Sequence, residues 1–333
     1  MNMRKRNWLM TALWGMSLLS GAMAAGAAAA ADGKICPSGP VQLIVPFPAG
    51  GGTDLQGRII ADPLAKRLGK QVVVINRPGA SGIVGEGAFV RSAKPDGCML
   101  VLATGATNAA APYLYKDFPF DPMKDFTPIA FVAAAPNVLY VNSKSKWRTA
   151  QDFIADARAH PGKFTYASGG TGTSSHLAGV LLAQKAGLNL VHVPYQGAAP
   201  ALSGLMGGQV DIDVDTAAQI SHVRSGSLRA LAVASLKRLQ ALPDVPTFDE
   251  VGVKGVQYAF WGGIAGPKNM PASIVNTLNE AINDVLREPK VHDYFINNGG
   301  QLSLMTPAQF KAFWMEELAR NKEIITAAGI KPN

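Results

Sequence analysis

The sequence has few charged residues and few of the residues that most often carry catalysis or bind metals. Only 16% of its 333 residues are charged, whereas 48% are hydrophobic. This composition excludes a disordered chain and a coiled coil, because such chains need many charges or few hydrophobic residues. The five histidines and two cysteines show no H-E-x-x-H motif and no zinc-ligand spacing, and the chain lacks a G-x-S-x-G motif. We therefore expect no metal, no cofactor and no enzymatic activity.

The formal net charge of +8 would suit a nucleic-acid partner, but the positive charges are dispersed. The chain has no cluster of basic and aromatic residues and no known nucleic-acid-binding module. Three of the cations, Arg4, Lys5 and Arg6, lie together at the N-terminus in front of an apolar run. We therefore expect no nucleic-acid partner.

The N-terminal segment has the three parts of a secretory signal peptide. After the three cations, residues 8–23 are apolar or small, and residues 24–31 are almost all alanine. A membrane anchor would need about 20 apolar residues and seldom ends in an alanine tract, so we expect cleavage after Ala31 and export to the periplasm. A lipid anchor would need a cysteine directly after that site, and Cys36 lies too far along. Cleavage lowers the net charge to +5, because the three N-terminal cations are removed.

The two cysteines lie close to the starts of two strand-like runs. Cys36 precedes the run 41–45, and Cys98 opens the run 98–102. In an oxidising compartment such a pair suits a disulfide. Two free buried thiols are the alternative.

From Val41 onwards, compact apolar runs rich in β-branched residues alternate with amphipathic stretches. Such runs are typical of strands buried on both faces of a parallel sheet. We expect strands at 41–45, 72–76, 99–104, 137–142, 164–167, 191–194, 210–214 and 228–234. We expect helices at 55–68, 150–159, 175–186, 199–206, 271–286, 291–297 and 307–328, with N-caps at Thr149 and Thr306. This order indicates an α/β protein with mainly parallel sheets, and the irregular strand spacing favours two lobes over one barrel.

The clearest candidate for a binding site is the glycine-rich segment 46–54, which follows the first expected strand. Three consecutive glycines lead into a helix for which we expect Thr53 or Asp54 as the N-cap. Glycines let backbone N–H groups turn outward, and a helix N-terminus adds positive potential, so the segment suits an anion. It lacks the lysine of a P-loop and the spacing of a dinucleotide fingerprint, which favours a carboxylate or another small oxyanion. A loop that only turns the chain is the alternative.

A second segment of the same design, 168–176, follows another expected strand and combines glycines with small hydroxyls before a helix. A third loop, 104–108, also follows a strand. Ligands of open α/β sheets bind beyond the carboxyl ends of the strands. We therefore expect these loops to hold a ligand from the two sides of a cleft.

Two further segments supply polar groups. Tyr195 follows an expected strand and could offer its ring and hydroxyl to a ligand. The aspartates of 211–215 lack the glycine and the terminal glutamate of a calcium-binding EF-hand, so we expect one to cap the next helix and the others to face solvent. For His176 and His192 we expect ordinary hydrogen bonds within a loop or helix, because no spacing indicates a catalytic pairing.

Seven segments occur in a specific order: VPFPAGGGTD, NRPGASGIVG, KPDGCMLVLAT, YASGGTGTSSHLAG, HVPYQGAAPAL, GGQVDIDVD and WGGIAGP. Together they resemble the Bug family of periplasmic solute-binding proteins, which serve tripartite tricarboxylate transporters. The similarity covers essentially the whole mature chain. It implies a type II periplasmic-binding fold, an α/β fold of two lobes joined by two crossover strands. Lobe one would span about 33–133 plus 260–333 and lobe two about 134–259, with crossovers near 133–138 and 258–262.

The resemblance also implies that a ligand carboxylate is held by backbone N–H groups, small hydroxyls and bridging waters. On the first lobe the implied contacts are Phe47, Gly51, Gly52, Thr53, Asp54, Ala106 and Thr107. On the second lobe they are Ser168, Thr171, Gly172, Thr173 and Ser174, with Tyr195 and Asp215 on the far wall.

Three positions depart from the usual pattern of the family. Gln196 stands where the family often has Lys or Arg, Val180 where it often has Glu, and Ala167 where it often has Gly. Gln196 removes a cation near the mouth of the site, which weakens the case for a second bound carboxylate there. The first carboxylate site is unaffected, because it depends on backbone and hydroxyl donors.

The expected partners are a small organic carboxylate and the subunits of a membrane transporter. The carboxylate could be a dicarboxylate, an amino acid or an aromatic acid, and we expect the protein to be a monomer. Two alternatives stay open. The same lobes could serve a receptor kinase as a sensor, or the protein could be a periplasmic enzyme that acts on a carboxylate.

Overall fold

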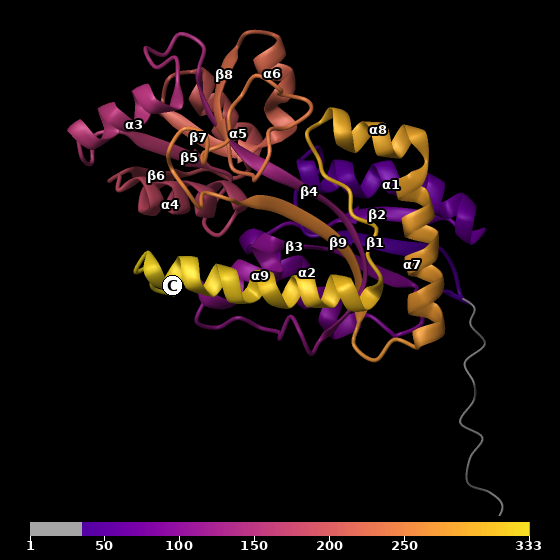
Figure 1. The fold of residues 1–333 in the computed structure, drawn as a ribbon. Helices are drawn as coiled ribbons and strands as arrows, with labels where there is room; N and C mark the ends of the chain where they lie inside the picture. The colour runs from indigo at the N-terminus through magenta and orange to yellow at the C-terminus, as the bar shows by residue number, and fades with distance from the viewer. Residues whose placement is uncertain (1–34, 333) are drawn as a thin grey trace, which may run out of the picture. The chain divides into compact units, whose positions relative to one another are not determined.

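The computed structural model describes residues 35–332, and the expected signal peptide lies outside these residues. Within them, a nine-stranded sheet has the order β2-β1-β3-β9-β4-β7-β5-β6, and β8 pairs with β4. Figure 1 shows β5 to β8 grouped with helices α3 to α6, and β1 to β3 grouped with α1, α2, α7 and α8. We call the group with β1 to β3 the first half and the group with β5 to β8 the second half. Each half includes the loops that follow its strands.

The first half contains three parallel strands. They are β1 (Val41–Val45), β2 (Val72–Asn76) and β3 (Met99–Thr104), with β1 in the middle. The long strand β9 (Ala259–Pro267) runs antiparallel to β3. All three parallel strands agree with the sequence-based prediction, because each is a short apolar run with clear ends.

The second half repeats this arrangement. Here β5 (Thr165–Ser168) lies between β6 (Val191–Pro194) and β7 (Ile212–Thr216), and all three are parallel. The strand β8 (Leu228–Val233) pairs with β4 instead. The strand predicted at 210–214 begins and ends two residues later in the structure.

Strand β4 (Phe126–Asn142) passes through both halves. Its residues 126–136 pair with β9, whereas its residues 137–142 pair with β7 and β8. The sequence predicts only the second part, because Pro128 and Pro136 interrupt the first and proline is rare inside strands. The structure accommodates Pro128 beside a register shift in the ladder with β9. Strands β4 and β9 therefore connect the two halves.

The helices are α1 (Gly52–Leu68), α2 (Ile83–Ser92), α3 (Ala150–Ala159), α4 (Ser174–Ala186), α5 (Ala198–Met206), α6 (Ile220–Arg224), α7 (Ala272–Arg287), α8 (Pro289–Asn297) and α9 (Pro307–Ala327). The sequence does not predict α2, whose Gly85 and Gly87 lower its helix propensity. Gly85 is required there, since a Cβ would collide with the carbonyl oxygen of Arg77. Among residues 35–332, the structure has no helix that is both long and apolar enough to span a membrane.

The helix N-termini differ in how they are capped. Thr149 and Thr306 each form a complete capping box, with Asp152 and Gln309 respectively, as predicted. Helix α1 begins at Gly52 with Gly51 as its N-cap, so the predicted cap at Thr53 or Asp54 is wrong. The glycines of this loop continue directly into the helix, and no side chain caps it.

Helix α9 packs on the cores of both halves. Near its start, Phe310 and Trp314 belong to a cluster with Phe126 and other first-half residues. Near its end, Ile324 and Ile325 belong to a cluster made mainly of second-half side chains. The side-chain amide of Gln184 on α4 also donates to the carbonyl oxygen of Ile324. Figure 1 shows α9, in yellow, running from beside α7 of the first half to below α4 of the second half.

The disulfide between Cys36 and Cys98 is present. The backbone N–H of Cys36 also donates to the carbonyl oxygen of Asp96 at 2.8 Å. The two cysteines are 62 residues apart and lie just before β1 and β3. The bond therefore fixes the start of two strands whose opposite ends lead into predicted binding loops.

Replacing both cysteines, as Cys36→Ser with Cys98→Ser, should lower the free energy of unfolding by about 2–4 kcal/mol, because a long loop is no longer closed in the unfolded chain. Urea denaturation of the oxidised wild type and the double variant measures this difference. Wild type treated with reductant is the control and should approach the variant. Equal midpoints for oxidised and reduced wild type would contradict the prediction.

Candidate ligand-binding site

The buried side chain of Asp54 holds the first predicted binding loop, residues 46–54, in place. Its side chain is 1% exposed, and its Oδ2 accepts hydrogen bonds from the Gly50 N–H at 2.8 Å and the Arg58 Nε at 2.9 Å. Asn76, at the end of β2, donates to Asp54 Oδ1 at 2.9 Å. Burial alone would raise the pKa of Asp54, but the hydrogen bonds from Arg58, Gly50 and Asn76 together hold this pKa below its ordinary value. Asp54 thus supports the loop as a carboxylate already surrounded by donors.

The N-terminus of α1 offers free backbone donors. Asn76 Nδ2 donates to the carbonyl oxygen of Phe47 at 3.0 Å, which holds the start of the loop. The first N–H that bonds within the helix is that of Leu55, which donates to Gly51. The N–H groups of the preceding turn therefore have no partner inside the helix. A Cβ on Gly52 would meet no atom within 4 Å, so the space beside these donors is open.

The side chain of Thr107, after β3, is bonded within the protein. It is fully buried, and its hydroxyl donates to the carbonyl oxygen of Ser81 at 2.7 Å. Its side chain therefore holds the neighbouring loop 79–82. Ala106 beside it is 9% exposed and is the more accessible residue of this predicted pair.

The second binding loop is built largely from its own hydroxyls. Ser168 is fully buried, with its Oγ 2.6 Å from His192 Nε2, and it accepts the N–H of Gly170 at 3.2 Å. The Thr173 hydroxyl donates to the carbonyl oxygen of Gly170 at 2.7 Å. No side chain caps α4, which begins at Ser174. The N-terminal amides of α4 are therefore free in the same way as those of α1.

Three predicted hydroxyls remain available. In the part of the chain that the structure describes, those of Thr53, Thr171 and Ser174 form no hydrogen bond with the protein. Gly172 lies beside Thr171 at a positive φ of 83°, and a Cβ there would collide with the side chain of Leu114. A glycine is therefore needed where the second loop approaches the segment after β3.

Two stacked histidines support the second loop. His176 Nδ1 accepts the Gly172 N–H at 3.1 Å, and the rings of His176 and His192 stack with centroids 4.1 Å apart. Tyr166 stacks on the other face of this pair, 4.8 Å from His192. Burial lowers the pKa of His176 to about 3 and that of His192 to about 4, with the charge of His192 adding to the effect on His176. Both rings are neutral at pH 7, and the predicted loop hydrogen bonds are confirmed.

Tyr195 lies beside the second loop only through its backbone. Its N–H donates to the carbonyl oxygen of Ser168 at 2.9 Å. Its hydroxyl donates to Gln209 at 3.5 Å, and its ring lies against Gly204 of α5. The Tyr195 side chain thus packs against α5 and bonds to Gln209 just after this helix.

The aspartates of β7 are not solvent-facing. Asp213 and Asp215 are 2% and 6% exposed, so the expectation that such residues face solvent is wrong. Asp215 accepts from the Thr216 N–H at 2.7 Å and from Gln219 at 3.2 Å. Burial raises the pKa of both carboxyls, and the charge of Asp215 raises that of Asp213 further. The reason is the central position of β7 between β4 and β5, which the sequence pattern does not reveal.

Asn76 and Ser81 are the polar residues of the site that the prediction omits. Asn76 joins Phe47 and Asp54, and its place at the end of a strand parallel to β1 is the signal that could have identified it. Ser81 joins Thr107 to Thr171, because its hydroxyl donates to the carbonyl oxygen of Thr171 at 3.0 Å. The structure thus brings the loops after β1, β2, β3 and β5 together.

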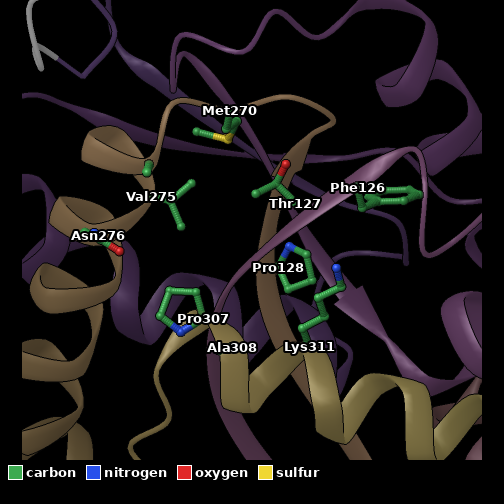
Figure 2. A pocket seen from close by; sticks show the side chains of 10 residues that line it. Phe126, Thr127, Pro128, Met270, Val275, Asn276, Pro307, Ala308 and Lys311 are labelled. Atoms are coloured by element: carbon green, nitrogen blue, oxygen red, sulfur yellow. The ribbon is translucent and has the colours of Figure 1, made fainter.

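A separate hollow of about 380 Å³ lies between the start of β4 and the N-termini of α7 and α9. Figure 2 shows Lys311, Pro307 and Val275 around it. None of the predicted ligand contacts lines this hollow, so it is distinct from the candidate site. Residues 35–332 contain no group of three or more His, Cys, Asp or Glu side chains arranged to bind a metal.

Solved structures with this fold define the class of protein. The periplasmic binding protein BugD superposes with a TM-score of 0.82 at 33% identity, over 89% of this chain and 100% of BugD. MatC of Rhodopseudomonas palustris with bound malate gives 0.80 at 29% identity, over 87% and 99%. A second R. palustris protein, with adipate, gives 0.84 at 30% identity, over 89% and 99%. The chain thus has the two-lobed α/β fold of a periplasmic binding protein.

Sequence comparison gives the family. Residues 57–330 match the tripartite tricarboxylate transporter family receptor, named TctC, and the chain belongs to this family. A protein of the tcbD-tcbE intergenic region of Pseudomonas sp. strain P51 is 36% identical over 299 residues, 89% of this chain and 88% of that protein. Protein BugT of Bordetella pertussis is 34% identical over 308 residues, 92% and 94% of the two chains. The resemblance to the Bug family is confirmed.

The histidine pair predicts a loss of stability in mild acid. Unfolded histidine has a pKa of about 6.5 and folded His192 one of about 4. Between these values the unfolded state binds more protons, so the folded state loses stability as the pH falls from 7. At pH 5, His192 should cost up to about 2 kcal/mol relative to pH 7. His192→Gln should therefore show a smaller fall in Tm than wild type over this range.

Thermal unfolding at pH 7, 6 and 5 measures this difference between the two proteins. Buried acids with a raised pKa, such as Glu86, act in the opposite direction, but they are common to both proteins and cancel in the comparison. His292→Gln, at an exposed histidine, is the matched control and should follow wild type. Parallel Tm curves for His192→Gln and wild type would contradict the assignment.

Proposed function

We propose that this protein captures a small organic carboxylate between its two lobes and delivers it to a membrane transporter of the tripartite tricarboxylate type. The observation that carries the proposal is the pair of uncapped N-termini of α1 and α4. Each helix follows the middle strand of a parallel triplet, β1 or β5, through a glycine loop, and its first-turn N–H groups have no partner within the helix. The N–H groups of Gly50, Gly170 and Gly172 are bonded to the protein and only shape these loops. The absence of a side-chain cap is shared by α2, α5, α7 and α8, so it is the position of α1 and α4 after glycine loops at the ends of β1 and β5 that distinguishes them.

The electrostatics of these loops suit one carboxylate bound by neutral donors. Backbone N–H groups at helix N-termini carry partial positive charge and stabilise anions. Arg58 already pairs with Asp54, and the two histidines are neutral, so neither supplies a free cation. The hydroxyls of Thr53, Thr171 and Ser174 complete the donor set. Bound malate and adipate in the two Rhodopseudomonas relatives support this ligand class.

We propose the lobe boundaries at 33–133 plus 260–333 for the first lobe and 134–259 for the second. The change of pairing partners along β4, from β9 to β7 and β8, supports a division near residue 136. The end of α9 packs with second-lobe side chains, which makes this helix a tie between the lobes. A ligand that contacts both loops binds the closed arrangement more tightly and shifts the population toward it.

We further propose that the chain is exported, acts as a monomer and leaves its ligand chemically unchanged. When expressed in a Gram-negative host, the mature protein should begin at Asp32 and be recovered from the periplasm. Intact-mass measurement and N-terminal sequencing of the periplasmic fraction test this. A full-length chain that stays with the membrane would contradict cleavage after Ala31.

A panel of carboxylic acids that includes malate and adipate tests the binding function. Isothermal titration should detect saturable binding of at least one acid, and native mass spectrometry should recover that acid unaltered. Gly52→Val should weaken this binding at least about ten-fold, because its side chain occupies the open space at the N-terminus of α1. The fold should be retained, since no protein atom lies within 4 Å of the new Cβ.

Gly39→Val is the matched control, because this glycine also has open space around its Cβ but precedes β1, at the end opposite the site. It should bind like wild type. Undiminished affinity in Gly52→Val would contradict a role for the N-terminus of α1 in ligand binding. Conversion of the acid to a product would show that the protein is an enzyme, which contradicts the proposed transport function.

A further inference from the structure

We infer that Ser81 is a positioning residue that fastens the two lobes together around the bound ligand. The inference rests on the proposed function, since it concerns the closed state of the same site. Ser81 lies in the loop 79–82, between β2 and α2. Its hydrogen bonds reach the loops after β3 and β5, which belong to different halves of the sheet.

Ser81 is bonded on both sides. Its carbonyl oxygen accepts the hydroxyl of Thr107 at 2.7 Å, which ties it to the first half. Its own hydroxyl donates to the carbonyl oxygen of Thr171 at 3.0 Å, which belongs to the second half. Thr107 and Thr171 thus become linked through one residue. A displacement of one half by about an ångström would break the second bond, since O–H···O hydrogen bonds extend to about 3.0 Å between the two oxygens.

The backbone holds the Ser81 hydroxyl in a fixed place. Ala80 and Ser81 have φ values of 44° and 52°, which are unfavourable for residues that carry a Cβ. The neighbouring Gly82 is packed so closely that a Cβ would collide with the hydroxyl of Thr107. Such strain persists where surrounding contacts fix the backbone, and it commonly marks a functional position. The Ser81 backbone is therefore fixed in the conformation from which its hydroxyl reaches Thr171.

The bond differs from the other contacts between the halves. Leu114 packs beside Gly172, and this apolar contact tolerates small shifts. Helix α9 packs on both cores and accepts a hydrogen bond from Gln184 of α4, but it lies outside the predicted binding loops. A hydrogen bond between two loops that grip the ligand is directional and exists in one arrangement. It therefore adds stability to the closed state specifically, which lowers the rate of ligand release more than it raises the rate of capture.

A role in closure and a direct contact with the ligand make different predictions. The hydrogen bond from Ser81 to Thr171 involves no ligand atom. Loss of the Ser81 hydroxyl should therefore weaken the binding of every acid by the same factor. A direct contact would weaken acids unequally, according to how each one reaches Ser81. The ratio of effects on two acids of different length, malate and adipate, distinguishes the two roles.

The test uses Ser81→Gly in the full-length mature protein. Glycine suits the positive φ and removes the hydroxyl together with its Cβ, so the Tm should be maintained or raised. We expect about five-fold weaker binding of malate and of adipate, the effect of losing one neutral hydrogen bond, and a dissociation rate increased by a similar factor in stopped-flow experiments. Ala80→Gly is the matched control: it adds the same flexibility, keeps the hydroxyl and should release ligand no faster than wild type.

A ligand-free measurement keeps the inference testable if neither acid binds. Hydrogen exchange of the amides of 168–174 should be faster in Ser81→Gly than in wild type, whereas Ala80→Gly should match wild type. Unchanged exchange and unchanged dissociation rates in Ser81→Gly would overturn the inference, as would clearly unequal losses for the two acids. Failure of wild type to bind any acid of the panel would count against the proposed function alone, because the exchange comparison still decides the role of Ser81.

Discussion

The continuity of β4 and β9 is the constraint on which the rest of the structure depends. These two antiparallel strands pair with each other and supply an edge to the parallel triplet of each half. Each half has helices of its own and shares α9 with the other, while the shared strands fix where the two sets of strand ends meet. Breaking either ladder would expose backbone groups, which is costly. These strands therefore connect the halves and help to fix where the predicted binding loops meet.

The proposed binding site would attract anions mainly through neutral donors. Helix N-termini contribute about 0.3–1 kcal/mol each toward a nearby anion. Asp54 is paired with Arg58, and the histidines are held neutral by burial. A site of this kind keeps its donors in place without a counter-ion, so little must be desolvated or rearranged when a carboxylate arrives. Because the proposed donors come from two loops, one in each half, contact with the ligand would depend on the arrangement of both halves.

Much of the fold can be predicted from the sequence, because local residue patterns determine many of its strands and helices. The parallel strands are compact apolar runs, and the capping boxes at Thr149 and Thr306 are local as well. The disulfide needs only an oxidising compartment and two strand starts. The first part of β4 is concealed by its prolines and α2 by its glycines, where pairing and packing override local preference. For the site, the sequence identifies the glycine loops but not which hydroxyls are free. Thr107, Ser168 and Tyr195 direct their side chains toward partners 26, 24 and 14 residues away, and only the folded chain reveals such partners.

Helix α9 has a consequence for how the molecule unfolds. Its first turns complete the core of one half, and its last turns complete the core of the other, so neither core is whole without the same helix. Residues 35–332 accordingly behave as part of one compact unit despite their two groups of strands. Two lobes that could otherwise melt independently share a single structural element, and loss of one exposes apolar surface in the other. Cooperativity between the lobes is thus built into the C-terminal helix, at a distance from the loops that bind the ligand.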